Sequence, residues 1–166
     1  AYYRKQFDCP TELKSKRVFL RFEGVGACAK VYVNKRMLGT HKGAYSAFAI
    51  EISEALKYGE VNEIVVLANN EQRPDVILFG VYGGIYRPVQ LIVTEKSNIT
   101  VTDNASPGVY VSQTNVTKKS ADISVNVKLD NADLHATSVS LETVIYTQEG
   151  KQVAKNVKEI NLTPQG

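Results

Sequence analysis

The sequence has no tryptophan, a single methionine and no long apolar run. A membrane-spanning helix needs about 20 consecutive apolar residues, and no stretch of the chain approaches that length. The opening residues, Ala1 to Lys5, also lack the apolar core of a signal peptide. No membrane helix is expected. A chain whose signal had been cleaved would begin in the same way, so the sequence does not determine the cellular location, and a periplasmic or secreted bacterial protein fits it.

A strong excess of either charge is missing as well. The net charge is only +3, with 20 Lys and Arg scattered among 17 Asp and Glu. A nucleic-acid interface needs basic side chains clustered on one face, often with interleaved aromatic residues. Neither nucleic acid nor a membrane is therefore expected as a partner.

The residues that build metal and nucleophile sites are few and unsuitably spaced. His41 and His135 lie far apart, and Cys9 and Cys28 lack the paired spacing of a zinc site. No Gly-X-Ser-X-Gly elbow occurs, and the glycines at 24 and 26 do not complete a dinucleotide fingerprint. We expect no metal and no cofactor. A Cys9–Cys28 disulfide is one interpretation of the two cysteines. Two thiols do not make a disulfide framework, however, and buried free thiols are the preferred interpretation.

The chain does contain the alternation typical of β-strands. In the run from Arg17 to Glu23, Val18, Leu20 and Phe22 share one face. Similar short runs predict strands at 4–7, 30–34, 37–39, 47–52, 62–67 and 85–93. No convincing long helix appears, so the fold class predicted is all-β. Lys35 stands where a two-residue hairpin turn would favour glycine, which predicts local strain or a wider loop.

From Ser97 onward the amino-acid composition changes: aromatic residues become rare, while Thr, Ser, Asn and Val alternate evenly. Strands are predicted at 99–101, 109–116, 121–129, 139–146 and 153–162, a spacing typical of a β-sandwich. An immunoglobulin-like domain usually has about seven strands. Residues 97–166 are therefore expected to form part of an immunoglobulin-like β-sandwich.

A double glycine precedes one alternating strand. Gly83 and Gly84 predict a tight bend or a close backbone approach, because glycine accepts a positive φ. Arg87 shares the strand phase of Ile85, Val89, Leu91 and Val93, which would place its charge in an apolar row. An unpaired buried charge is very costly. We therefore predict that Arg87 is buried and paired, with Glu23 as the first candidate.

Several motifs in order then carry a family resemblance. They are Tyr3-Arg4-Lys5-Gln6-Phe7 followed by Pro10; Lys16 to Val25; Ala29 to Asn34 with Leu38-Gly39; His41-Lys42-Gly43 with Tyr45 and Phe48; Gly59-Glu60 with Asn62; and Tyr82-Gly83-Gly84-Ile85-Tyr86-Arg87. Together they resemble the sugar-binding domain of glycoside hydrolase family 2, the β-galactosidase and β-glucuronidase family. The resemblance covers residues 2–93, and residues 98–166 match only in class.

The resemblance implies a domain plan. Residues 1–96 would form a jelly-roll, galactose-binding-like β-sandwich, and 97–166 the start of the immunoglobulin-like domain that follows it in the family. The family's jelly roll begins well before the Tyr-Arg strand, so residue 1 is expected to lie inside a domain. The implied partners are carbohydrate and a C-terminal catalytic barrel of the same polypeptide.

The same resemblance implies where sugar contacts would lie. The family places an acidic residue five positions before the first glycine of the pair, and here that position is Leu78, which accepts no hydrogen bond. Asp75 is the acid left in the segment. Asp75 and Arg73 are therefore the sugar-contact candidates, although an exposed turn residue after Pro74 is the simpler interpretation of Asp75.

Catalysis is not expected from these 166 residues. Retaining glycosidases use two carboxylates about 5–5.5 Å apart, which in this family come from a (β/α)₈ barrel. No βα repeat occurs in the sequence. The dipeptides Asn62-Glu63 and Asn70-Glu71 mimic the family's Asn-Glu catalytic pair without a barrel around them. The chain is predicted to be the non-catalytic front portion of a family 2 glycosidase, β-galactosidase-like. The alternatives are a free-standing carbohydrate-binding module, which the lack of tryptophan disfavours, and a structural β-sandwich pair.

Overall fold

The computed structural model describes residues 1–70 and 83–164, and it is all-β as predicted. The elements are β1 (Tyr2–Asp8), η1 (Thr11–Ser15), β2 (Arg17–Phe22), β3 (Cys28–Val33), β4 (Arg36–Lys42), β5 (Phe48–Glu51), η2 (Ser53–Ala55), β6 (Val61–Asn69), β7 (Val89–Thr94), β8 (Ser97–Ile99), β9 (Val109–Thr114), β10 (Asp122–Val127), β11 (Leu129–Asn131), β12 (Thr137–Tyr146) and β13 (Gln152–Leu162). The two η elements are single 3₁₀ turns. Within the described ranges no helix is long and apolar enough to span a membrane.

The chain divides into two compact units. Unit 1 comprises Ala1–Glu95 together with Val101–Ser106, and unit 2 comprises Lys96–Thr100 and the chain from Pro107 onward. The loop Val101–Ser106 thus belongs with the strands that precede it. It is held there by Arg21, whose Nε donates to the Ala105 carbonyl at 3.0 Å.

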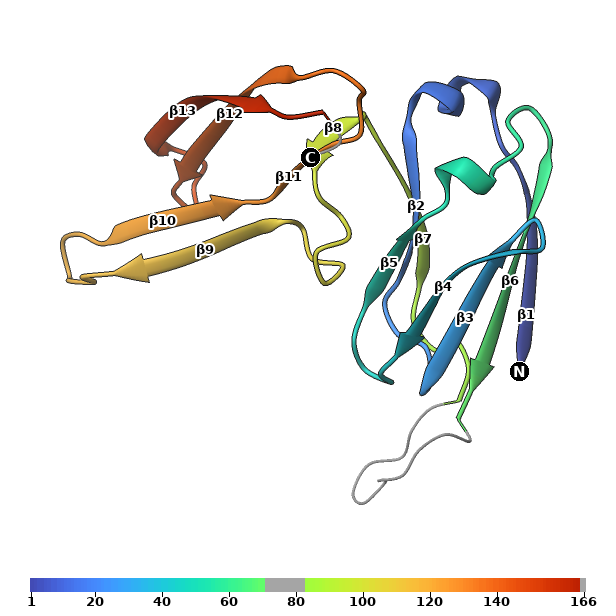
Figure 1. Ribbon diagram of the computed structural model, residues 1–166. Helices are drawn as coiled ribbons and strands as arrows, with labels where there is room; N and C mark the ends of the chain where they lie inside the picture. Colours follow the sequence, from blue (N-terminus) through green and yellow to red (C-terminus); the bar gives the residue numbers. More distant parts are fainter. Residues whose placement is uncertain (71–82, 165–166) are drawn as a thin grey trace. The chain divides into compact units, whose positions relative to one another are not determined.

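Unit 1 is a sandwich of two antiparallel sheets (Figure 1). One has the strand order β1-β6-β3-β4 and the other β5-β2-β7. Alternation places Val18, Leu20 and Phe22 of β2 on the inner face, where all three are buried. The facing sheet contributes Ala29, Val31, Val33, Val66 and Ala68 to the same core. The expected phase of β2 is confirmed.

The hairpin between β3 and β4 turns at Asn34 and Lys35, whose φ angles are +50° and +70°. Both values lie in the left-handed region, which a two-residue type I′ turn requires and which a non-glycine residue adopts at a cost. The strain predicted at Lys35 is therefore present, and the loop has not widened to avoid it.

The buried Asn62 and the half-buried Asn34 bond to each other at the same end of unit 1. Asn62 is 0% exposed and uses its whole amide: Nδ2 donates to the carbonyls of Lys57 (2.8 Å) and Glu60 (2.9 Å). Its Oδ1 accepts from the Lys57 amide (2.8 Å) and from Asn34 Nδ2 (2.7 Å). Asn34 in turn accepts from the Glu63 amide and donates to the Ala55 carbonyl. These bonds fasten the β3–β4 turn to the loop that leads into β6.

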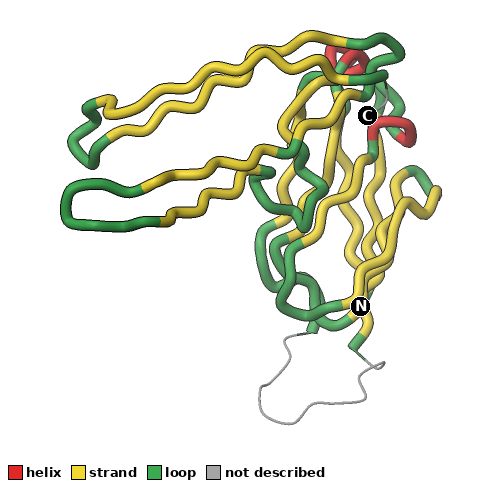
Figure 2. The backbone as a smooth tube through the Cα atoms, turned by 60° about the vertical axis from the view of Figure 1, so that its left-hand side comes forward, coloured by secondary structure: helices red, strands yellow, loops and turns green. Residues whose placement is uncertain are grey.

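Unit 2 consists of antiparallel strand pairs: β8 with β11, β9 with β10, and β12 with β13. Figure 2 shows the two long hairpins, β9–β10 and β12–β13, as paired strands joined by loops. Asn131 is 2% exposed and is bonded as fully as Asn62. Its Nδ2 donates to the carbonyls of His135 and Thr163, and its Oδ1 accepts from Ser97 Oγ and the Asp133 amide.

Both cysteines are free thiols, in agreement with the preferred interpretation. Cys9 is buried in the core, and this burial raises the pKa of its thiol. Cys28 is half-buried.

Candidate functional site

Three loops meet at one end of unit 1, and we call them the loop rim: residues 24–27, 43–47 and 83–88. The Gly26 amide donates to the Gly84 carbonyl at 2.7 Å, and Val25 forms an isolated antiparallel bridge with Ile85. The Gly43 amide donates to the Ala27 carbonyl at 2.9 Å. Main-chain bonds therefore connect the three loops to one another.

The double glycine lies at the centre of this rim. Gly84 has a φ of +78°, and a Cβ built on it would lie 1.9 Å from Tyr3 Oη. A Cβ on Gly83 would lie 2.9 Å from Asn70 Nδ2. The close backbone approach expected of the glycine pair is thus found at both positions. Tyr3 of the Tyr-Arg strand fills the space that a side chain at Gly84 would need.

Tyr86 packs where a third glycine leaves room. A Cβ on Gly24 would meet the Tyr86 ring at 2.7 Å, and the Tyr86 hydroxyl donates to the Ala44 carbonyl. One side chain therefore joins two of the three loops. The sequence alone gave no role to Gly24, but the close packing of the Tyr86 ring requires a glycine there.

The prediction for Arg87 and Glu23 is wrong. Arg87 is exposed, and Glu23 accepts instead from Arg21 Nη1 at 2.9 Å. The cause is Pro88, which has no amide to donate to a ladder and so ends the strand phase: β7 begins at Val89, and Arg87 lies in a bend before it. Arg21 and Glu23 are two apart on one strand run and share a face, a signal that the sequence did contain.

The sugar-contact candidates Arg73 and Asp75 lie outside the described residues. The described residues on either side of that segment are neighbours, because the Asn70 side chain packs against Gly83 of the loop rim.

The glutamate of the first Asn-Glu dipeptide has a structural role. Glu63 forms an ion pair with Arg4 across the β1–β6 ladder, and its backbone amide donates to Asn34 Oδ1. Glu71 lies outside the described residues. No group of three or more His, Cys, Asp or Glu side chains in the described ranges could hold a metal ion.

His41 is a hydrogen-bonded residue at the edge of the rim. Its ring stacks on Phe48 with centroids 4.2 Å apart, and Nε2 lies 3.1 Å from Ser46 Oγ. Desolvation lowers the pKa of His41 from 6.5, although hydrogen bonds to Gly43 and Ser46 oppose that shift. The imidazole is therefore neutral over more of the pH range in the folded chain than in the unfolded one.

This shift gives a pH dependence of known sign. Below pH 6.5 the unfolded chain takes up a proton at residue 41 before the folded chain does, so stability falls as the pH drops through that range. Because the ring is partly exposed, we expect a loss of less than about 1 kcal/mol between pH 7 and pH 5.5. Urea unfolding at both pH values measures it. His41→Gln should remove the difference and His135→Gln should keep it; the reverse pattern would contradict the assignment.

Comparison with known proteins finds a match to a glycosidase family. The family model described as "Glycosyl hydrolases family 2, sugar binding domain" matches residues 1–95. A β-glucuronidase from Bacteroides fragilis is 39% identical over 164 residues, which is 96% of this chain and 23% of that protein. The chain thus spans about a quarter of the length of this relative.

Solved structures agree with this match. A Bacteroides fragilis protein proposed to be a β-galactosidase is 65% identical, with a TM-score of 0.95 over 99% of this chain and 25% of its own. A Bacteroides uniformis β-glucuronidase is 27% identical, also with a TM-score of 0.95, over 99% of this chain and 20% of its own.

Proposed function

The chain belongs to glycosyl hydrolase family 2 through its sugar-binding domain, and we propose from this that it is the non-catalytic front portion of a larger glycosidase. Its role is to brace a catalytic barrel elsewhere in the same polypeptide and to form one wall of the sugar pocket. The relatives carry the names β-glucuronidase and β-galactosidase, so the proposed substrate class is a β-glucuronide or a β-galactoside.

The observation that carries this proposal is the construction of the loop rim. Gly83 packs against Asn70, Gly84 packs against Tyr3, and the Tyr86 hydroxyl donates to the Ala44 carbonyl, so the described residues that flank positions 71–82 lie at one end of the sandwich. The family resemblance places the non-barrel sugar contact in the segment just before the double glycine. A rigid rim at that position suits a loop that must present a side chain at fixed geometry.

A free-standing carbohydrate-binding module and a structural sandwich pair are less well supported. The relatives that this chain matches are about four to five times longer than the matched part, as the 23% and 20% coverages show. A chain with that relation to its relatives fits a portion of an enzyme better than an independent module.

The 166-residue chain by itself should hydrolyse no aryl β-glycoside. Glu63 is tied to Arg4, and hydrolysis with retention needs two carboxylates about 5–5.5 Å apart. Release of p-nitrophenol from p-nitrophenyl β-glucuronide and β-galactoside, followed with the purified chain, tests this. Turnover that disappears in a Glu63→Gln or Glu71→Gln variant would overturn the proposal, whereas turnover unchanged in both variants would indicate a contaminant.

In the full-length protein, Asp75→Ala should lower kcat/KM for the glycoside without lowering stability, since an ionised carboxylate is a strong acceptor for sugar hydroxyls. Arg73→Ala should act in the same direction. Losing one charge-assisted hydrogen bond corresponds to roughly a tenfold drop in kcat/KM. Glu12→Ala, which removes an exposed acid from the 3₁₀ turn η1, is the matched control. Unchanged kinetics in both loop variants would leave the segment as scaffold.

A further inference from the structure

The two sheets of unit 1 differ in how their outer faces are covered. On the sheet β5-β2-β7, Phe19 alternates with the core residues of β2 and so faces outward, yet it is 0% exposed. The guanidinium carbon of Arg17 lies over its ring, 5.0 Å from the centroid. Arg21, two positions along the same strand, donates to the carbonyl of Ala105, whose side chain is 3% exposed. Other residues of unit 1 therefore already cover this outer face at Phe19.

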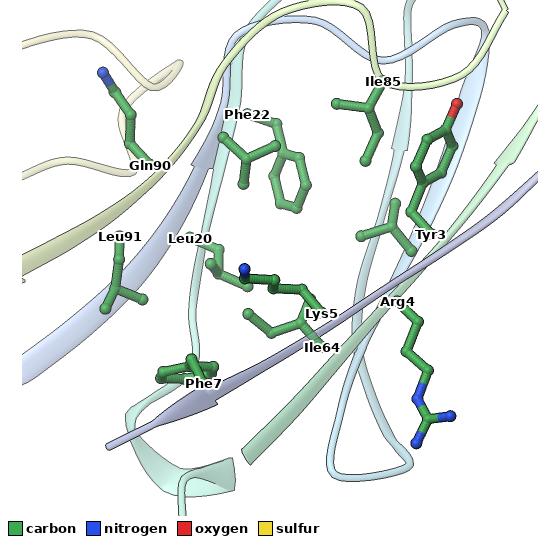
Figure 3. A pocket seen from close by; sticks show the side chains of 12 residues that line it. Tyr3, Arg4, Lys5, Phe7, Leu20, Phe22, Ile64, Ile85, Gln90 and Leu91 are labelled. Atoms are coloured by element: carbon green, nitrogen blue, oxygen red, sulfur yellow. The ribbon is translucent and has the colours of Figure 1, made fainter. Parts of the chain in front are cut away.

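The sheet β1-β6-β3-β4 has an outer face that is open to solvent along β3 and β4. The core residues of β3 occupy alternate positions, so the positions between them, including Lys30 and Tyr32, face outward. Figure 3 shows the same alternation on β1 of this sheet: Tyr3 and Phe7 line the inner pocket, whereas Arg4 points away from it. The ladder pairs then tell which outward side chains are neighbours.

Two lysines come together on this outer face. Lys30 lies directly opposite Thr40 of β4, and Lys42 lies two positions further along β4. Diagonal neighbours of this kind have Cβ atoms roughly 7–8 Å apart, within reach of long side chains. Both lysines are exposed. In the described part of the chain neither has an ion-pair partner, and no Asp or Glu occurs in β3 or β4.

Apolar side chains adjoin the two lysines. Tyr32, the next outward residue of β3, pairs with Val65 of β6 and Met37 of β4, and Leu67 of β6 pairs with Lys30. Met37 is 55% exposed, and the other three apolar residues are half-buried. A contiguous apolar surface edged by polar groups marks an interaction site. We define the basic face as Lys30, Tyr32, Thr40, Lys42 and Leu67.

The chemistry of the basic face suits a flat, acidic sugar. An aromatic ring presents a rigid apolar surface on which the C–H face of a pyranose can pack. Lysine ammonium groups donate to carboxylates, and a threonine hydroxyl both donates to and accepts from sugar hydroxyls. A uronic acid unit combines an apolar ring face, hydroxyl groups and one carboxylate. The basic face offers a matching group for each of the three.

We propose that the basic face binds a glycan chain that contains uronic acid units. Tyr32 contacts a sugar ring, and Lys30 and Lys42 bind carboxylates of the chain. Strand β3 begins directly after rim residues 24–27, and β4 ends directly before rim residues 43–47, so the Lys42 end of the face borders the loop rim. A chain that lies along the face therefore leads to the rim, where the sugar contact is proposed.

The choice of a glycan as ligand rests on the proposed function, because a β-glucuronide carries the same carboxylate. The basic face holds the body of the chain rather than its reacting end. Other anionic partners match it less well. A nucleic acid needs more phosphate contacts than two lysines provide. An acidic peptide supplies carboxylates but no sugar ring to pack on Tyr32.

Binding of two matched glycans to the full-length protein tests the proposal. The probes are hexamers of β-1,4-linked glucuronate and of β-1,4-linked glucose, which differ only in the carboxylate or CH2OH group on each ring. Each carries a fluorophore at its reducing end, and fluorescence anisotropy is measured with excess free glucuronic acid and galactose to occupy the sugar pocket. The acidic hexamer should bind with a Kd of about 1 mM or lower, weakened by added salt. The neutral hexamer should bind at least about tenfold more weakly.

Variants of the basic face locate the binding. Lys30→Gln combined with Lys42→Gln should weaken binding of the acidic hexamer about five- to thirtyfold, since two exposed charge pairs are lost. Tyr32→Val, which keeps a β-branched side chain and removes the ring, should weaken it as well. The matched control is Lys118→Gln combined with Lys119→Gln. It removes the same charge from the exposed loop between β9 and β10 and should leave binding unchanged.

The native thiol of Cys28 reports the position of the glycan, because Cys28 pairs with Lys42 in the β3–β4 ladder. Saturating acidic hexamer should slow its modification by N-ethylmaleimide severalfold, as read by peptide mass spectrometry, and the neutral hexamer should not. No binding of the acidic hexamer, equal binding of both hexamers, an equal loss in the control variant, tighter binding of hexaglutamate, or an unprotected Cys28 would each overturn the proposal. None of these readouts uses hydrolysis, so failure here leaves the proposed function standing.

Discussion

Asn62→Ala should lower the free energy of unfolding of unit 1 by about 3–4 kcal/mol, because it removes the four hydrogen bonds of a fully buried side chain and leaves part-buried groups without those partners. The Lys57 amide, the Lys57 and Glu60 carbonyls and the Asn34 amide all lose a bond to this one side chain. Since Asn62 is 0% exposed, water cannot replace these bonds unless the loop opens. Urea unfolding of the 166-residue chain, with amide hydrogen exchange at Lys57 as the local readout, measures the effect.

The matched control is Asn131→Ala, which removes an equally buried and equally bonded amide from unit 2. It should accelerate exchange at the Asp133 amide, which Asn131 binds directly, and leave exchange at Lys57 unchanged. If Asn62→Ala cost less than about 1 kcal/mol, within the range of ordinary surface substitutions, the asparagine network would not be a main support of unit 1.

Gly84→Ala is the second substitution with a large expected effect. Its φ of +78° costs a non-glycine residue about 1–2 kcal/mol, and crowding against Tyr3 adds about 1–3 kcal/mol. We expect a total loss of roughly 2–5 kcal/mol in unit 1, with the larger figure if the Tyr3 ring cannot move. Thermal unfolding and urea unfolding both measure it.

Two further variants separate the causes of that loss. Gly83→Ala has only the Asn70 amide to displace and no positive φ, so it should cost less than about 1 kcal/mol. Tyr3→Ala combined with Gly84→Ala should recover the crowding part and leave the backbone part. If the double variant loses as much free energy of unfolding as the two single variants lose together, Tyr3 is not the obstacle.

The sequence predicted the central strands of unit 1 well because the apolar residues that alternate along them are buried in the core. In β2, Val18, Leu20 and Phe22 occupy alternate positions and therefore share one face. The sequence thus predicted that this face is the inner one, and all three residues lie in the core. The same reasoning failed at Arg87, where alternation was continued through Pro88 although proline interrupts a ladder. The rule was sound, but it was applied beyond the end of the strand.

The contacts that build the site could not be predicted in the same way. Asn34 and Asn62 were each recognised in motifs, yet their mutual bond joins residues 28 positions apart. Local pattern carries no information on which loops meet. The packing of Tyr3 against Gly84 likewise depends on the order of strands in the sheet. For unit 2 the sequence predicted β9, β10, β12 and β13, whereas β11 was not predicted and the strand expected at 99–101 lies at Ser97–Ile99. The immunoglobulin-like assignment of residues 97–166 stays a prediction.

The bond from Arg21 to the Ala105 carbonyl has a consequence for dividing the protein into fragments. The family model ends at residue 95, which makes that residue an obvious place to cut. A fragment ending there would lack Val101–Ser106, although this loop belongs to unit 1 and contains the 3%-exposed side chain of Ala105. Arg21 would keep Glu23 and Gln90 as partners but would lose its backbone acceptor. The shortest fragment that retains the whole of unit 1 therefore ends after Ser106.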